Sequence, residues 1–146
     1  MASDQNWWAE RVGNETWIGH SPSGATVVMA PSEAGLPNSF TPGELLKLAL
    51  AGCAGMSSEG PARRRLGDDY AATIEVRGTS HPVDDRYESF TETIRLDTSA
   101  LDHAGREALV AAMTRAIDRT CTVGLTVRHG APVTFEIADA HDQPAD

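Results

Sequence analysis

The chain has 146 residues and a mass of 15.5 kDa, a size typical of one domain. Hydrophobic residues make up 40% and charged residues 23%, the composition of a globular protein with a packed core rather than of a disordered chain. The net charge of -9 repels nucleic-acid phosphates and anionic lipid. Composition therefore disfavours nucleic acid and membrane surfaces as partners.

No segment approaches the roughly 18 consecutive apolar residues of a membrane-spanning helix, because Lys47 interrupts the richest stretch, residues 45–56. The first six residues carry no basic residue ahead of an apolar run, so they do not predict a secretory signal. We expect a cytoplasmic protein with one domain over residues 1–138. A flexible polar tail is expected over residues 139–146.

Short apolar pieces alternate with turn signals in the first 31 residues, which predicts strands. The expected strands span residues 7–12, 15–20 and 25–30. Residues 32–40 contain Gly and Pro and are expected to form a loop.

A helix is expected to begin at Pro42. Thr41 is a suitable N-cap, and Glu44 three residues later completes a capping box. Pro61 is expected to break or kink this helix, and Gly67 to stop it. Apolar residues recur with the 3.6-residue period and place Cys53 on the face expected to be buried. This predicted stripe comprises Leu45, Leu48, Ala49, Gly52, Cys53 and Met56.

Alternating apolar and polar residues predict two further strands, at residues 70–79 and 86–96, joined as an antiparallel pair. A second helix is expected over residues 101–118, and residues 120–124 either interrupt it or begin another turn. A last strand is expected over residues 132–138. The resulting order, βββαββαβ, predicts an α+β domain.

Two segments resemble the OsmC/Ohr family of osmotically inducible and organic hydroperoxide resistance proteins. The first is Phe40-Thr41-Pro42-Gly43-Glu44-Leu45-Leu46, with Ala49-Leu50-Ala51-Gly52-Cys53 after it. The second is Cys121-Thr122-Val123-Gly124. Together with the element order, the resemblance extends over residues 7–137.

The resemblance implies a thiol-dependent peroxidase of the stress response that reduces organic hydroperoxides. It implies an intertwined homodimer with a central, buried, cysteine-bearing helix and active sites at the subunit interface. By motif, Cys53 is peroxidatic and Cys121 resolving. No cofactor or metal is expected, and an external dithiol or lipoyl-type reductant would restore the thiols.

This chemistry requires a first thiol of lowered pKa, a second within disulfide reach, and a stabilising cation. Thr120 is expected to cap a helical turn whose amides stabilise Cys121, whereas activation of Cys53 is expected from side chains elsewhere. In the peroxidase branches an Arg of the N-terminal strand region pairs with a Glu ten residues before the first Cys, where this chain has Gly43. The possible supporting residues are Glu44, which is also explained as a cap, and Arg11, Arg63, Arg64 and Arg65.

Two alternatives remain open from the sequence. One is a non-catalytic binding or stress-response domain that kept the scaffold and the thiols without the activating Arg. The other is a hydrolase or isomerase that uses an interface pocket with other groups. The five histidines show no metal-ligand spacing.

Overall fold

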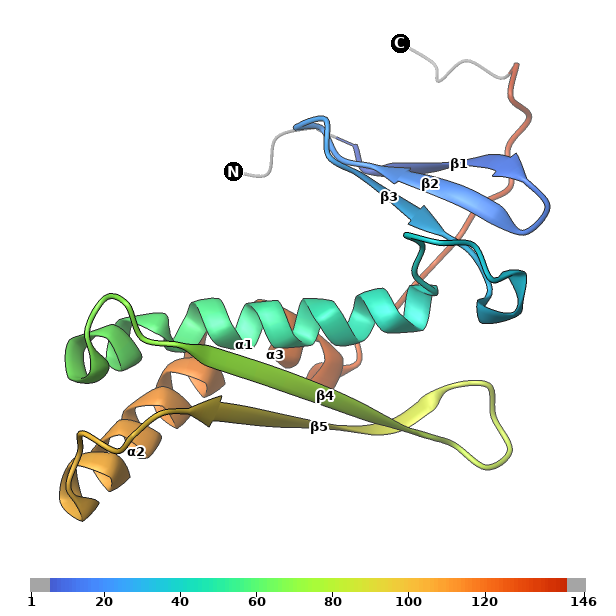
Figure 1. Ribbon diagram of the computed structural model, residues 1–146. Coiled ribbons are helices and arrows are strands. Elements are labelled where there is room, and N and C mark those ends of the chain that lie inside the picture. Colours follow the sequence, from blue (N-terminus) through green and yellow to red (C-terminus); the bar gives the residue numbers. More distant parts are fainter. Residues whose placement is uncertain (1–5, 142–146) are drawn as a thin grey trace, which may run out of the picture.

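The computed structural model describes residues 6–141 (Figure 1). Residues 1–5 and 142–146, which belong to the predicted domain and the predicted tail, lie outside the described residues. Two antiparallel sheets combine with helices, which confirms the α+β class. The elements are β1 (Trp8–Gly13), β2 (Thr16–His20), β3 (Thr26–Met29), the short 3-10 helix η1 (Ser32–Ala34), α1 (Pro42–Leu66), β4 (Ala72–Ser80), β5 (Tyr87–Leu96), α2 (His103–Thr120) and α3 (Thr122–His129).

The three strands predicted at the N-terminus are present, and they form one antiparallel sheet in the order β1-β2-β3. A single parallel bridge from Met29 to Phe40 leads the chain from β3 toward α1. Figure 1 shows this sheet standing apart from the helices, above the N-terminal end of α1. The side chains of Trp8 and Trp17 are 53% and 42% exposed. The sheet therefore contributes little to the core of this chain.

The predicted start of α1 is confirmed. The Thr41 amide donates to Glu44 Oε2 at 2.7 Å, and the Glu44 amide donates to Thr41 Oγ1 at 3.2 Å, which completes the capping box. Of the predicted break or kink at Pro61, the break does not occur, because α1 continues to Leu66 and ends before Gly67, whose φ is 94°. Pro61 and its neighbour Ala62 are buried, and their packing offsets the one helical hydrogen bond that a proline removes.

The predicted apolar stripe of α1 is not the face that this chain buries. Leu48 and Met56 are 52% and 79% exposed, and Cys53 is half-buried. The buried residues instead follow one another at helical spacing on a different face, toward α2, α3 and the β4–β5 hairpin. They are Leu50, Ala54, Ser58, Pro61 and Ala62.

The β4–β5 hairpin lies beside α1, and α2 crosses the C-terminal half of α1 (Figure 1). Ala62, Leu109 and Met113 form the buried cluster at this crossing, with Leu96 and other partly buried side chains around it. Asp102 caps α2 by accepting from the Gly105 amide at 2.7 Å, so the helix starts two residues later than predicted. This crossing holds α1 and the start of α3 in place.

The predicted last strand is wrong, since residues 132–138 form no strand and follow α3 as an extended segment. Val133, Phe135 and Ile137 are 89%, 89% and 91% exposed. A strand needs a neighbouring strand to satisfy its amides and carbonyls, and none lies beside this segment within the described residues. Over residues 6–141, no helix has both the length and the apolarity needed to span a membrane.

Candidate functional site

The fold brings Cys53 and Cys121 together, although they are far apart in the sequence. Cys53 lies in the middle of α1, and Cys121 is the residue at which α2 ends and α3 begins. The start of α3 packs against α1, so the two thiol side chains adjoin. Both cysteines are free, with Cys53 half-buried and Cys121 buried. The arrangement allows one sulfur to react with the other.

The pKa values of the two thiols are shifted in opposite directions. The Val123 amide at the start of α3 stabilises the Cys53 thiolate and lowers the pKa of Cys53, with smaller support from the Cys121 thiol and the Thr122 amide, against a partial effect of burial. Burial raises the pKa of Cys121, which the adjacent Cys53 raises further although the Gly124 amide opposes it. Cys53 is therefore the better nucleophile near neutral pH, and Cys121 the thiol that holds its proton.

The helical turn expected after Thr120 exists as α3, but its N-terminus differs from the prediction. Thr120 does not cap it, because the Thr120 hydroxyl donates to the Ala116 carbonyl at 2.7 Å. The first amides of α3 face Cys53, and Cys121 itself occupies the cap position. The first amides of α3 therefore lower the pKa of Cys53, for which the sequence predicted side chains. The Gly124 amide also lowers the pKa of Cys121, as predicted, although burial outweighs this effect.

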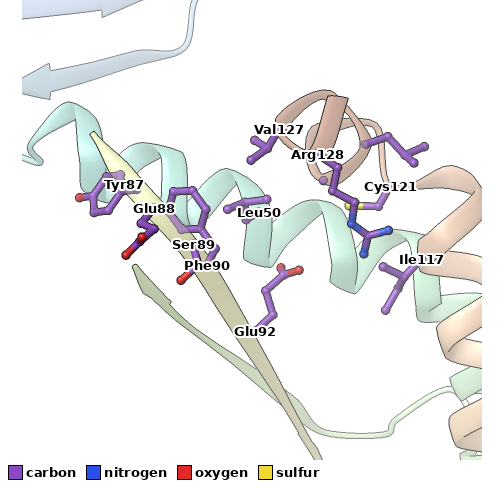
Figure 2. A pocket seen from close by; sticks show the side chains of 12 residues that line it. Leu50, Tyr87, Glu88, Ser89, Phe90, Glu92, Ile117, Cys121, Val127 and Arg128 are labelled. Atoms are coloured by element: carbon purple, nitrogen blue, oxygen red, sulfur yellow. The ribbon is translucent and has the colours of Figure 1, made fainter. Parts of the chain in front are cut away.

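A cavity of about 400 Å³ adjoins Cys121 between β5, α1 and α3 (Figure 2). Its apolar wall comes from Leu50, Phe90, Ile117, Leu125 and Val127. Its size is in the range of small-molecule sites, and the apolar wall suits a ligand with a hydrocarbon portion.

Three charged side chains of this cavity were missed from the sequence: Glu88 and Glu92 of β5 and Arg128 of α3. Figure 2 shows Glu92 projecting from β5 toward α1, with Arg128 beside Cys121. The Arg128 Nη1 atom lies 3.0 Å from Asp118 Oδ1. Burial raises the pKa of Glu92, and the attraction of Arg128 offsets only part of this effect.

The supporting residues predicted from the sequence do not gather at the thiols. Arg11 lies on β1 opposite Trp17, in the sheet that stands apart from the helices. Arg63 pairs with Asp68 at 2.9 Å. Arg64 and Arg65 are exposed at the C-terminal end of α1, about 17 to 18 Å along the helix axis from Cys53. Glu44 serves the capping box.

Tyr87 occupies the space beside Gly43. A Cβ atom added at Gly43 would lie 2.5 Å from the Tyr87 hydroxyl oxygen, and one added at Gly78 would lie 2.7 Å from the Tyr87 ring. The Lys47 ammonium lies 4.9 Å from the centre of the same ring. The absence of a side chain at position 43 is thus explained by the packing of Tyr87 onto the first turn of α1.

No group of three or more His, Cys, Asp or Glu side chains in the described part of the chain could hold a metal ion. His20, one of the five histidines, stacks on Trp8 with ring centres 4.7 Å apart and contacts Glu10 at 3.1 Å.

Comparison with known proteins identifies the family. The model of the family described as OsmC-like protein matches residues 35–136, which include both cysteines. The chain belongs to the OsmC-like family. A relative in Mycobacterium tuberculosis (strain ATCC 25618 / H37Rv), named as an uncharacterized protein, is 43% identical over 132 residues, covering 90% of this chain and 95% of its own.

Solved structures share the OsmC-like fold at low sequence identity. The organic hydroperoxide resistance protein OhrB of Bacillus subtilis matches with a TM-score of 0.57 at 18% identity, covering 85% of this chain and 90% of its own. An OsmC-like protein of Mycoplasma pneumoniae matches with a TM-score of 0.62 at 12% identity, covering 89% and 91%. These matches confirm the expected α+β fold of the chain.

The lowered pKa of Cys53 predicts selective alkylation in this OsmC-like protein. A group of lowered pKa is deprotonated at lower pH than usual, so Cys53 should react with iodoacetamide at a pH where an ordinary thiol is still protonated. Cys121 should react later and at higher pH. Mass spectrometry of peptides from a pH series measures both rates, and equal pH profiles for the two cysteines would contradict the assignment.

Proposed function

We propose that this protein is a thiol-dependent peroxidase that reduces organic hydroperoxides through a two-cysteine cycle. The observation that carries the proposal is the adjoining pair of free thiols with opposite pKa shifts. The Cys53 thiolate attacks the terminal oxygen of the hydroperoxide, the O–O bond breaks, and an alcohol leaves after taking up a proton. Cys53 is then a sulfenic acid.

Cys121 completes the cycle. Its sulfur attacks the sulfenic sulfur of Cys53, which forms a disulfide and releases water. An external dithiol or lipoyl-type reductant then reduces the disulfide by thiol exchange, so no bound cofactor is needed. The apolar wall of the cavity beside Cys121 supports the proposal that the substrates are hydroperoxides with a hydrocarbon portion. The name of the Bacillus subtilis relative, an organic hydroperoxide resistance protein, also supports this substrate class.

The function is tested by titrating the reduced protein with cumene hydroperoxide. Each chain should lose two thiols per peroxide consumed and gain one Cys53–Cys121 disulfide, because both electrons come from this pair. Thiol counting and mass spectrometry of unreduced peptides measure the two quantities. A protein whose thiols remain unchanged, or that forms only disulfides between chains, does not perform this cycle.

The positions of the arginines that were predicted to support Cys53 favour a second candidate function, a non-catalytic binding domain. Arg11 and Arg63–Arg65 lie away from Cys53, so none of them supplies the predicted cation within this chain. This candidate predicts Cys53 alkylation with the pH profile of an ordinary thiol, together with saturable binding of an apolar ligand. The alkylation series described above separates the two candidates.

We also propose that the protein forms a homodimer. Two apolar surfaces lie open in the single chain: the α1 face with Leu48 and Met56, and the alternating segment with Val133, Phe135 and Ile137. Alternation of apolar and polar residues suits a strand with one covered face, which this chain does not supply to itself. A second copy can cover both surfaces and would complete the crevice around the half-buried Cys53.

The dimer predicts that Phe135→Asp shifts the protein toward the monomer, because the charge enters an apolar interface without a partner. Thr134→Asp is the matched control, since it adds the same charge to the neighbouring, oppositely directed position. Sedimentation at several protein concentrations measures the change. Wild-type protein that sediments as a monomer at every concentration would contradict the dimer.

A further inference from the structure

Glu92 is a carboxylic acid on the part-buried, otherwise apolar face of β5. It lies between Phe90 and Ile94 on the part-buried face of β5, where its two neighbours are apolar. Its Oε1 atom is buried and meets no hydrogen-bond partner among residues 6–141. An unpartnered buried polar atom costs about 1 to 3 kcal/mol, and more for a charged group. Such an atom, on a residue that lines the same cavity as Cys121, suggests a chemical role.

The charged and titratable groups around Glu92 leave its carboxyl without an ion pair. Arg128 of α3 is bound to Asp118 of α2 at 3.0 Å. Tyr87 and the exposed Glu88 line the same cavity from β5, and Cys121 lines it from the start of α3, with Cys53 of α1 adjacent to Cys121. Burial raises the pKa of Glu92 more than Arg128 lowers it, so the carboxylate is a stronger base than an ordinary glutamate.

The proposed cycle needs such a base. Burial raises the pKa of Cys121, so this thiol is protonated near neutral pH, yet it must attack as a thiolate. Glu92 and Cys121 face one cavity of about 400 Å³, which has room for water. A carboxylate can take a proton from a thiol through one bridging water.

We propose that Glu92 accepts the proton of Cys121 through a water in the cavity during disulfide formation, an inference that rests on the proposed peroxidase cycle. The Cys121 S–H bond breaks and its proton passes to the Glu92 carboxylate. The electron pair left on Cys121 forms the S–S bond while the S–O bond of the Cys53 sulfenic acid breaks. The departing hydroxide regains the proton from Glu92 and leaves as water, so Cys53 is reduced, Cys121 is oxidised and Glu92 is unchanged.

The test is Glu92→Gln, which keeps the shape of the side chain and removes the base. Reduced protein is mixed with cumene hydroperoxide, quenched at short times with dimedone, which traps the sulfenic acid, and analysed by mass spectrometry. The first step, oxidation of Cys53, should be unchanged. Disulfide formation should slow by about 100-fold near neutral pH, the usual contribution of a general base. In the variant this rate should recover about tenfold per pH unit, as Cys121 ionises unaided.

Glu75→Gln is the matched control, because it removes the same charge from an exposed residue of the neighbouring strand β4, which does not line the cavity. It should leave both steps unchanged. If Glu92 acted only by its negative charge, which raises the pKa of Cys121, Glu92→Gln would accelerate disulfide formation. An accelerated, unchanged or pH-independent rate therefore overturns the proposal. A wild-type protein that forms no sulfenic acid contradicts the peroxidase function itself, a result distinct from these.

Discussion

Replacing Cys53 with serine should abolish hydroperoxide turnover, whereas replacing Cys121 should leave the first oxidation nearly unchanged. The difference follows from the site, where the Val123 amide favours the Cys53 thiolate and burial keeps Cys121 protonated. With Cys121→Ser, Cys53 should react once and remain as a sulfenic acid, because no second thiol can displace its oxygen. Peroxide consumption with a dithiol reductant and dimedone trapping measure the two effects.

The double variant, with serine at both positions, is the control for this experiment. Its peroxide consumption should equal that of buffer with reductant alone. Full activity in Cys53→Ser would assign the nucleophile elsewhere. Activity that survives in the double variant would favour the hydrolase or isomerase hypothesis, which uses groups other than the thiols.

The second large effect is expected on stability. Leu109 is fully buried and packs against Ala62 of α1 and Met113 on its own helix. Leu109→Ala should lower the free energy of unfolding by about 2 to 5 kcal/mol, because it removes apolar contacts and leaves a cavity. Urea denaturation at fixed protein concentration measures the change, the fixed concentration being needed if unfolding is coupled to dissociation.

Val110→Ala is the matched control in the next position of α2, where the side chain is 57% exposed. It should change the free energy of unfolding by less than about 0.5 kcal/mol, as is usual at the surface. Equal losses for the two variants would mean that the α1–α2 crossing does not form the core described here.

Local sequence patterns predicted those elements whose cause is local. The capping box at Thr41, the alternation of β4 and β5, and the stop at Gly67 depend on residues close together in the chain, and the structure has each of them. The break expected as one outcome at Pro61 and the strand expected over residues 132–138 do not form, for a different reason. A helix continues through a proline, and a segment becomes a strand, according to what packs against it, which one short window of sequence does not contain.

The candidate site was predicted in part. The family motifs pointed to Cys53 and Cys121, which the fold brings together. The amides that lower the pKa of Cys53 belong to α3, and only tertiary packing reveals them. Glu92 could have been recognised from the sequence. It alternates with Phe90 and Ile94 and therefore falls on the apolar face of its strand. Arg128 could also have been recognised from the sequence, because it follows Cys121 by seven residues, or about two helical turns, which predicts that both lie on one side of a helix.

The proline inside α1 has a consequence for how this helix opens. Pro61 carries no amide hydrogen, so the carbonyl of Ser57 receives no helical bond from position 61. Ser57 lies one turn after Cys53, and its hydroxyl adds a small stabilisation of that thiolate. The hydrogen-bond ladder of α1 is thus interrupted between its capped N-terminal part, which bears Cys53, and its C-terminal part, which packs against α2. The amides of these two parts of α1 should therefore exchange with deuterium at different rates. Local opening of the helix near Cys53 can then occur without unfolding of the part packed against α2.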